Sequence, residues 1–207
     1  MRLLIAIPVY DKIPYEFMQS LTKLVMHLKD EKIRFDVEII GGTLIYVARD
    51  KLAGKAINEG YTHMLWLDSD MVFTPDLVED LMFSGKDFVT GVYHSRHTPY
   101  VSCIFKSISL DSLERYDTDY PKDTFEVAGC GFGCVFINVD ILRAVNINYG
   151  TCFLPMKSFG EDLAFCKRAT DLGYHIYCEP GAILGHVGHV TIYPEDREIY
   201  CKRYEGC

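Results

Sequence analysis

Asp68 and Asp70 stand one residue apart, directly after the apolar run His63–Leu67, which predicts a buried strand. Successive strand residues point to opposite sides, so carboxylates at positions i and i+2 can face one site. Carboxylates beside a core are costly unless they are paired or bind a cation. Open α/β sheets place their ligand sites at this end of their strands. The pair therefore suggests Mg²⁺ or Mn²⁺ carrying a phosphate-bearing substrate. The alternative is a pair of solvated turn residues.

Two other Asp-x-Asp sites fit this segment less well. A calcium EF-hand loop needs further oxygen ligands and a glycine at fixed offsets, whereas Met71–Phe73 follow here. An aspartyl-phosphate phosphatase would have Thr two residues after Asp70, where Val72 stands. Of the Asp-x-Asp sites considered, a divalent cation that binds substrate phosphates is the one that this segment fits best.

A histidine far downstream is a candidate third ligand. His186 lies in the segment Gly185–His189, and a histidine added to two carboxylates favours Mn²⁺ over Mg²⁺. A lone histidine is usually structural, but the flanking glycines permit close backbone approach. His189 is the less favoured of the two histidines.

Two acidic residues stand at a predicted helix start. Ser158 and Glu161 have the spacing of a capping box, which predicts a structural role for Glu161. Asp162 lies in the first turn, where the helix dipole favours negative charge, and it has no capping role. It is free to act as a general base toward an acceptor hydroxyl.

Two further segments could contact substrates. Arg49 lies in a predicted helix, either as a solvated surface residue or pointing to the ligand edge of the sheet, where it would hold a nucleotide or its phosphates. Cys130–Gly133 resembles half a phosphate loop at most, because it lacks the Lys-Ser/Thr end. We expect it to be a close-approach loop beside a second substrate.

The elements that position these residues alternate between strand and helix through the first ninety residues. This predicts an α/β fold with a mostly parallel central sheet flanked by helices. The second half has short strands, glycine-broken segments and two helices, which predicts a small antiparallel element. We expect one domain over 1–207, with a nucleotide-binding half over about 1–95 and an acceptor-binding half over about 96–207. The expected strands are 3–9, 35–40, 62–67, 87–92, 174–178 and 182–184, the expected helices include 139–145 and 158–172, and 111–123 is an expected loop.

Composition narrows the class of protein. The 207 residues are 49% hydrophobic and 24% charged, which is typical of a globular domain. The net charge of −8 argues against nucleic-acid binding, which needs basic patches. The apolar start is too short for a signal peptide, and no run is long enough to span a membrane. We therefore expect a cytoplasmic protein with its eight cysteines reduced, and we do not expect structural zinc.

Taken together, these segments resemble a glycosyltransferase of the GT-A fold, near the large inverting family of nucleotide-sugar transferases. The similarity covers roughly residues 1 to 190. Asp50 departs from the usual asparagine of that family, and the chain is short, with little room for large acceptor regions. The similar segments, in chain order, are Ile7–Tyr10, Val47–Asp50, Leu67–Met71 around the DxD motif, Gly129–Ile137, Gly160–Phe165 and Leu184–Gly188.

The resemblance implies a role for each matching residue. Asp70 and His186 would bind the metal, Mn²⁺ or Mg²⁺, and Asp68 would contact the ribose, or the metal through water. Asp162 would be the catalytic base. The remaining implied contacts are Pro8, Val9, Tyr10, Arg49 and Ser69 with the nucleotide sugar, and Gly131, Phe132 and Glu161 on the acceptor side.

The predicted function is metal-dependent transfer of a sugar from a nucleoside diphosphate sugar to an acceptor hydroxyl, with inversion. A UDP-sugar is favoured over a GDP-sugar, and the acceptor is a glycan, a lipid-linked group or another hydroxyl compound. Three alternatives remain open: a retaining glycosyltransferase, a nucleotidyltransferase, and an inactive nucleotide- or sugar-binding module. A peripheral membrane or homo-oligomer contact also stays open.

Overall fold

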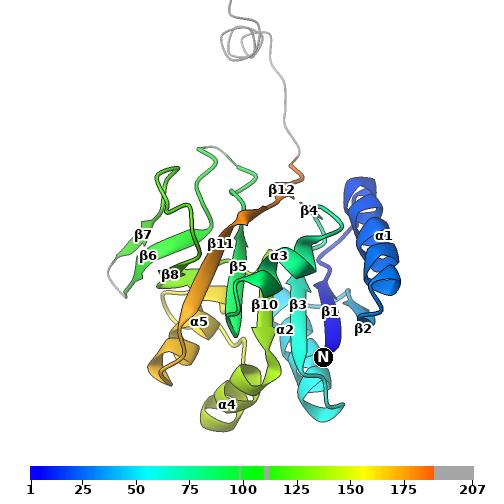
Figure 1. Cartoon of the computed structure of the whole chain (residues 1–207). Helices are drawn as coiled ribbons and strands as arrows, with labels where there is room; N and C mark the ends of the chain where they lie inside the picture. Colours follow the sequence, from blue (N-terminus) through cyan, green and yellow to red (C-terminus); the bar gives the residue numbers. More distant parts are fainter. Residues whose placement is uncertain (98, 110–111, 189–207) are drawn as a thin grey trace, which may run out of the picture.

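The computed structural model describes residues 1–97, 99–109 and 112–188, and in these residues a seven-stranded sheet forms the centre. Figure 1 shows this sheet with helices on both sides. Five of its strands run in one direction, and β10 and β8 run against them. The predicted mostly parallel α/β sheet is therefore confirmed. In spatial order the strands are β2 (Arg34–Ile40), β1 (Arg2–Pro8), β3 (His63–Leu67), β10 (Cys134–Asn138), β5 (Phe88–Val92), β11 (Ile176–Ile183) and β8 (Phe125–Val127).

Two small antiparallel sheets lie beside the main one. One pairs β4 (Met71–Val72) with β12 (Gly185–His186), and the other has the order β7 (Leu113–Arg115), β6 (Ile104–Ile108), β9 (Gly129–Cys130). They confirm the predicted antiparallel element. The expected loop over 111–123 contains β7, and the two short strands expected over 174–184 are the single strand β11, whose register shifts between Cys178 and Ile183.

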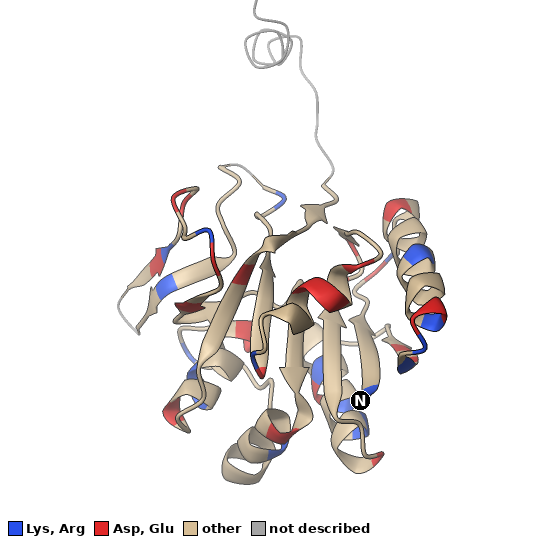
Figure 2. Ribbon diagram, viewed as in Figure 1, with Lys and Arg blue, Asp and Glu red and all other residues tan. Residues whose placement is uncertain are grey.

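Helices cover both faces of the sheet, as predicted. The buried faces of α1 (Tyr15–Asp30) and α3 (Leu77–Phe83) pack on one side with β1 and β3 residues such as Leu3 and Leu65. The other side holds α2 (Ile45–Asn58), α4 (Val139–Tyr149) and α5 (Glu161–Asp171). Charged residues lie mainly on the helices, the loops and the small sheet β7–β6–β9, which we call the outer sheet. Few charged residues lie in the middle of the main sheet (Figure 2).

One helix start differs from the sequence expectation in a way that matters for the site. The N-cap of α5 is Gly160, without a side-chain cap, because Phe159 pairs with Met156 in an isolated bridge just before it. Ser158 therefore does not cap this helix, and the predicted capping box with Glu161 is wrong. Glu161 is left free to turn toward other partners.

Asp50, the departure from the family's usual asparagine, has a structural role. Its carboxylate accepts hydrogen bonds from Thr151 Oγ1 at 2.6 Å and from the backbone N–H groups of Cys152 and Phe153, both at 2.9 Å. The segment it fixes brings the Phe153 ring onto Phe165, with 4.9 Å between their centroids. Asp50 thus ties α2 to the segment that precedes α5.

Candidate active site

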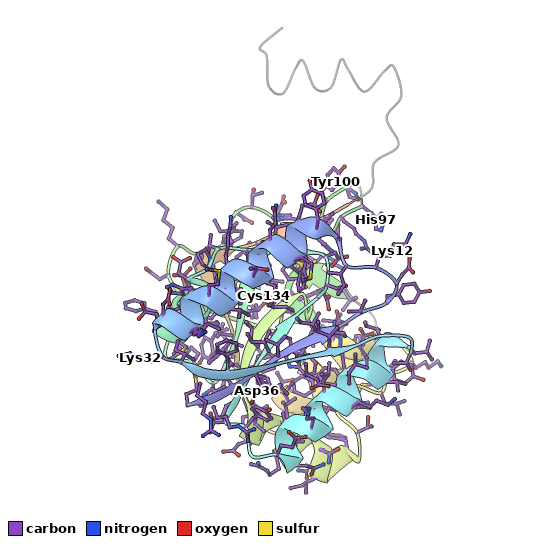
Figure 3. All side chains as sticks on the ribbon, turned by 90° about the vertical axis from the view of Figure 1, so that its right-hand side faces the viewer. Lys12, Lys32, Asp36, His97, Tyr100 and Cys134 are labelled. Carbon is purple, nitrogen blue, oxygen red and sulfur yellow. The ribbon has the colours of Figure 1, made fainter. Side chains whose placement is uncertain are left out.

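A cavity of about 570 Å³ lies at the carboxyl edge of the sheet, where the segments after β1, β3 and β5 meet the start of α5 and β12. This is the end of the sheet at which Lys12, His97 and Tyr100 lie, away from Lys32 and Asp36 (Figure 3). The lining residues are Pro8, Tyr10, Ile45, Arg49, Asp68, Ser69, Asp70, Tyr93, Ser95, Arg96, His97, Cys103, Phe105, Arg115, Gly131, Phe132, Glu161, Asp162, Leu163 and His186.

Every residue to which the resemblance gave a role at the site lines this cavity, except Val9. The Val9 side chain is 8% exposed and packs in the core with the α1 residues, because it points to the opposite side of the chain from Pro8 and Tyr10. Residues separated by up to about 180 positions thus converge on one edge of the sheet. His189 lies outside the described residues.

Arg49 is the buried cation of the cavity. It reaches from α2 between the faces of Trp66 and Phe132, with its Cζ 5.7 and 5.4 Å from their centroids. Its Nη2 donates to Asp68 Oδ1 at 2.7 Å, and its Nε lies 3.5 Å from Glu161 Oε1. Burial raises the pKa of Asp68, and the Arg49 charge opposes that shift. The solvated-surface interpretation of Arg49 is therefore wrong.

Two nitrogens of this guanidinium lack a hydrogen-bond partner. Arg49 is 3% exposed, and among the described residues neither its Nη1 nor its Nε makes a hydrogen bond, although Nε has the ion-pair contact with Glu161. A buried donor left unpaired is costly, and such donors are typically satisfied by ordered water or a ligand. An acceptor oxygen of a molecule in the cavity would satisfy the Nη1 donor.

Asp70 and His186 meet through strand pairing. β12 places His186 opposite Met71, and the Val187 N–H donates to the Asp70 carbonyl at 2.8 Å. His186 Nε2 lies 3.4 Å from Asp70 Oδ1, and its Nδ1 lies 2.9 Å from the His94 carbonyl. Burial opposes ionisation of Asp70, but the bond to His186 and its charge, with that of Arg96, lower the pKa of this carboxyl.

The donor set at Asp70 fits a divalent cation. Because Nδ1 of His186 donates to a carbonyl, Nε2 is the nitrogen left to bind a metal, which is the usual second-shell arrangement of a histidine ligand. Arg96 also pairs with Asp70, so this carboxylate already has a cationic partner in the protein. Within residues 1–97, 99–109 and 112–188 no three His, Cys, Asp or Glu groups gather as a complete metal cluster. Asp70 and His186 would therefore supply part of a shell that substrate oxygens and waters complete.

Asp162 stands apart from these ion pairs. Its Oδ1 accepts the N–H of the next residue, Leu163, at 2.7 Å. Burial, and then the neighbouring Glu161 charge, raise the pKa of Asp162 to about 6. A carboxylate with a pKa near neutrality, at a cavity wall, has the property that general-base catalysis needs.

The glycines of the segment 129–133 serve the approach of Tyr93. A Cβ on Gly131 would lie 2.3 Å from the Tyr93 hydroxyl, and one on Gly133 would lie 2.7 Å from its Cζ. The Gly133 N–H donates to that hydroxyl at 2.9 Å. We expected this segment to be a close-approach loop beside a second substrate. The close approach seen here is that of Tyr93, while Gly131 and Phe132 line the cavity. Tyr93 in turn packs its ring edge-on to His186, with 5.8 Å between centroids.

Several lining residues were not predicted from the sequence. They come from the segment after β5 and from the small outer sheet, and include Tyr93, Arg96, Cys103, Phe105 and Arg115. The segment after β5 carried one usable signal, since it follows a predicted strand at the ligand edge. The outer-sheet residues carried none, because their position depends on pairing between distant segments.

The sequence matches no family model and no curated protein. Solved structures nevertheless share its fold. A197 from STIV is 20% identical with a TM-score of 0.54, over 93% of this chain and 97% of that one. The catalytic domain of Drosophila β1,4-galactosyltransferase 7, in complex with xylobiose, is 13% identical with a TM-score of 0.54, over 95% of this chain and 78% of that one. GalNAc-T7 with UDP, GalNAc and Mn²⁺ is 10% identical with a TM-score of 0.57, over 91% of this chain and 44% of that one.

This chain has a GT-A fold. At such low identity the likeness establishes the architecture alone. No helix in the described part of the chain has the length and apolar character needed to span a membrane.

Proposed function

We propose that this protein transfers a sugar from a nucleoside diphosphate sugar to an acceptor hydroxyl, with a divalent cation and with inversion. The observation that carries the proposal is the convergence of Asp68, Asp70, Asp162 and His186 on one cavity at the carboxyl edge of a GT-A sheet. A solvated turn would not join the first two to a buried arginine and a histidine.

Two structural neighbours support the class of substrate. GalNAc-T7 was solved with UDP, GalNAc and Mn²⁺, and β1,4-galactosyltransferase 7 with xylobiose. We propose by analogy that a UDP-sugar is the donor, with a GDP-sugar as the main rival, and that a glycan or other hydroxyl compound is the acceptor. Mn²⁺ fits the mixed oxygen and nitrogen donors of Asp70 and His186 better than Mg²⁺ does.

The donor side is organised by Arg49, Asp68 and Asp70. Arg49 holds Asp68 in place and offers the N–H groups of its Nη1 to an acceptor oxygen of the nucleotide sugar. Pro8, Tyr10 and Ser69 line the same wall. A bound divalent cation would neutralise the diphosphate and make it a better leaving group.

The acceptor side is organised by Asp162. With a pKa of about 6, its carboxylate is ionised at neutral pH and can accept the proton of an acceptor hydroxyl. The freed oxygen would attack the anomeric carbon on the face opposite the diphosphate, which inverts the configuration. No other carboxylate of the cavity among the described residues is outside a protein ion pair.

The test is an assay for release of nucleoside diphosphate from a panel of UDP- and GDP-sugars, with Mn²⁺ and a mixed acceptor library. We expect Asp70→Asn to abolish transfer and Asp162→Asn to reduce it by about 100-fold or more. Asp171→Asn, an exposed acid at the far end of the same helix, is the matched control and should keep activity.

Other outcomes would point to the alternative functions. Release of pyrophosphate would indicate a nucleotidyltransferase. A product with retained anomeric configuration would exclude the inverting mechanism and the base role of Asp162. Binding of UDP with Mn²⁺, without transfer or donor hydrolysis, would show an inactive binding module.

A further inference from the structure

Arg115 is an exposed cation that lines the cavity. Three arginines line the cavity. Arg49 pairs with Asp68 and Glu161, and Arg96 pairs with Asp70. Among the described residues, no carboxylate pairs with Arg115, although carboxylates surround the other two. An unmatched positive charge at the wall of a cavity suits an anionic group of a ligand.

The side chain of Arg115 is nonetheless held in place. β7 pairs with β6 so that Arg115 lies opposite Phe105, and its guanidinium carbon stands 4.3 Å from the centre of that ring. Its Nη1 donates to the Ser102 carbonyl at 2.7 Å. A guanidinium has five N–H donors in a rigid fork, so most of its donors remain for a carboxylate or a phosphate. A stacked and anchored arginine loses little rotamer freedom on binding such a group.

Arg115 lies on the same side of the cavity as the start of α5, which carries the proposed base. Phe105, over whose ring the Arg115 guanidinium stands, packs in one hydrophobic cluster with Leu163, the residue after Asp162. Arg115, Phe105, Asp162 and Leu163 all line the one cavity. A molecule that lies over Phe105 and Leu163 would reach the base at one end and the cation at the other.

We propose that Arg115 selects an acceptor that carries a carboxylate or a phosphate, and binds this group while the acceptor hydroxyl lies at Asp162. The inference rests on the proposed function and adds the charge class of the acceptor. The chain carries a net charge of −8, and four carboxylates line the cavity, so an anionic acceptor needs a local cation to enter. Arg115 is the described residue that supplies it on the acceptor side.

Binding tests this proposal independently of turnover. Three probes are compared by titration calorimetry: a disaccharide that ends in glucuronic acid, its glucose counterpart, and a sugar phosphate of similar size. Each is measured with the chain alone and again with UDP and Mn²⁺. We expect the anionic probes to bind the wild type about 10- to 100-fold more tightly than the neutral one, the usual advantage of a charged hydrogen bond. The two anionic probes distinguish a carboxylate from a phosphate.

Variants then assign the preference to one side chain. Arg115→Gln should remove it without changing binding of the neutral sugar, and Arg115→Lys should keep part of it. Lys106→Gln, on the neighbouring strand β6 and outside the cavity lining, is the matched control for surface charge. Thermal unfolding of each variant shows whether the fold is intact.

Two results would overturn the proposal: equal binding of anionic and neutral probes by the wild type, or a preference that survives in Arg115→Gln. Anionic probes that bind through Arg115 but are never glycosylated would keep Arg115 as an anion-binding residue and would count against the transferase function on which its acceptor role rests.

Discussion

Asp162 is held in a state that costs the folded protein stability. Its pKa in the fold, about 6, is above the ordinary Asp pKa of 3.8, so the fold favours the protonated carboxyl. Above pH 4 the unfolded chain ionises more readily than the folded one, and stability falls as the pH rises from about 4 to 6. Such a cost is typical of catalytic residues, because activity needs the charge that folding opposes.

Asp162→Asn should therefore lose activity and gain stability. We expect transfer to fall by about 100-fold or more, the usual contribution of a general base. We expect the free energy of unfolding at pH 7 to rise by about 1–3 kcal/mol, as a pKa shift of this size implies. Transfer by the wild type should also rise with pH through about 6, measured between pH 4.5 and 8 under constant salt.

Urea unfolding at pH 4.5 and pH 7 provides the control for this prediction. At pH 4.5 the wild-type carboxyl is mostly protonated, so the variant should show little advantage there. A variant that is less stable than the wild type at pH 7 would contradict the burial argument. One that keeps its transfer rate would contradict the base assignment.

Arg49 is the residue whose loss should damage the fold most directly. Its guanidinium compensates two carboxylates, Asp68 and Glu161, beside the core. Removal of one partner of a buried ion pair costs about 3–5 kcal/mol, because the other charge stays buried. We expect Arg49→Met to lower stability by that order and to abolish nucleotide binding.

The double variant Arg49→Met with Asp68→Asn separates the effect of leaving Asp68 unpaired from the effect of losing the arginine itself. It should recover part of the lost stability in urea unfolding, since one of the two uncompensated charges is gone and only that of Glu161 remains, but it should not recover nucleotide binding. If the single variant unfolds at the same urea concentration as the wild type, Arg49 is not the electrostatic anchor of this site.

At the scale of elements, one wall of the cavity depends on a close approach between two segments. Tyr93, which directly follows β5, lies against the glycines between β9 and β10. Gly131→Ala should cost about 1–3 kcal/mol by overpacking against the Tyr93 hydroxyl. In a Tyr93→Phe background the same change should cost little, because the next Tyr93 atom, Cζ, is 3.4 Å away. Equilibrium unfolding of the four proteins in this cycle measures the coupling.

Gly133→Ala is the matched control for this cycle. Its Cβ would meet Cζ at 2.7 Å and Cε2 at 2.9 Å, ring atoms that Tyr93→Phe retains. The cost of this substitution should therefore persist in the Phe background. Equal rescue at both glycines would mean that the hydroxyl is not what excludes a side chain at Gly131.

The elements differ in how well the sequence predicts them. β1, β3 and β5 are apolar runs, and the helices between them have regular buried faces, so pattern alone places them. β7 is polar, and its three residues are exposed, so its strand conformation comes from pairing with β6 and has no local signal. The start of α5 was misplaced because the Met156–Phe159 bridge, a tertiary detail, occupies the position of the expected cap.

At the scale of the whole molecule, the site too contains residues that a local sequence pattern predicts and residues that only tertiary packing brings into place. Asp68, Asp70, Asp162 and His186 could be predicted because each stands at a recognisable place, a strand end, a helix start or a glycine-flanked turn. Arg96 and Arg115 lie in polar segments that resemble any solvated surface, and only the packing of distant segments brings them to the cavity. Residues that select a substrate are thus harder to find from sequence than residues that anchor a metal.

Ligand-linked stability of the whole chain tests the metal site without any knowledge of the acceptor. A ligand that binds only the folded state stabilises it by about 2.7 kcal/mol at 100 times its Kd. For a chain of this size that corresponds to a rise in Tm of about 5–10 °C. We expect UDP with Mn²⁺ to give such a shift, and UDP or Mn²⁺ alone to give much less, because Asp70 and His186 supply only part of the metal shell.

His186→Ala should lose the Mn²⁺-dependent part of this shift and keep the rest. His175→Ala, an exposed histidine paired with Glu126 far from the cavity lining, is the matched control and should keep the whole shift. His186 also packs against Tyr93, so its loss will lower the starting Tm, and the comparison must be of shifts. A Mn²⁺-dependent shift that survives in His186→Ala would show that the cation is held elsewhere, and would leave this histidine with a structural role only.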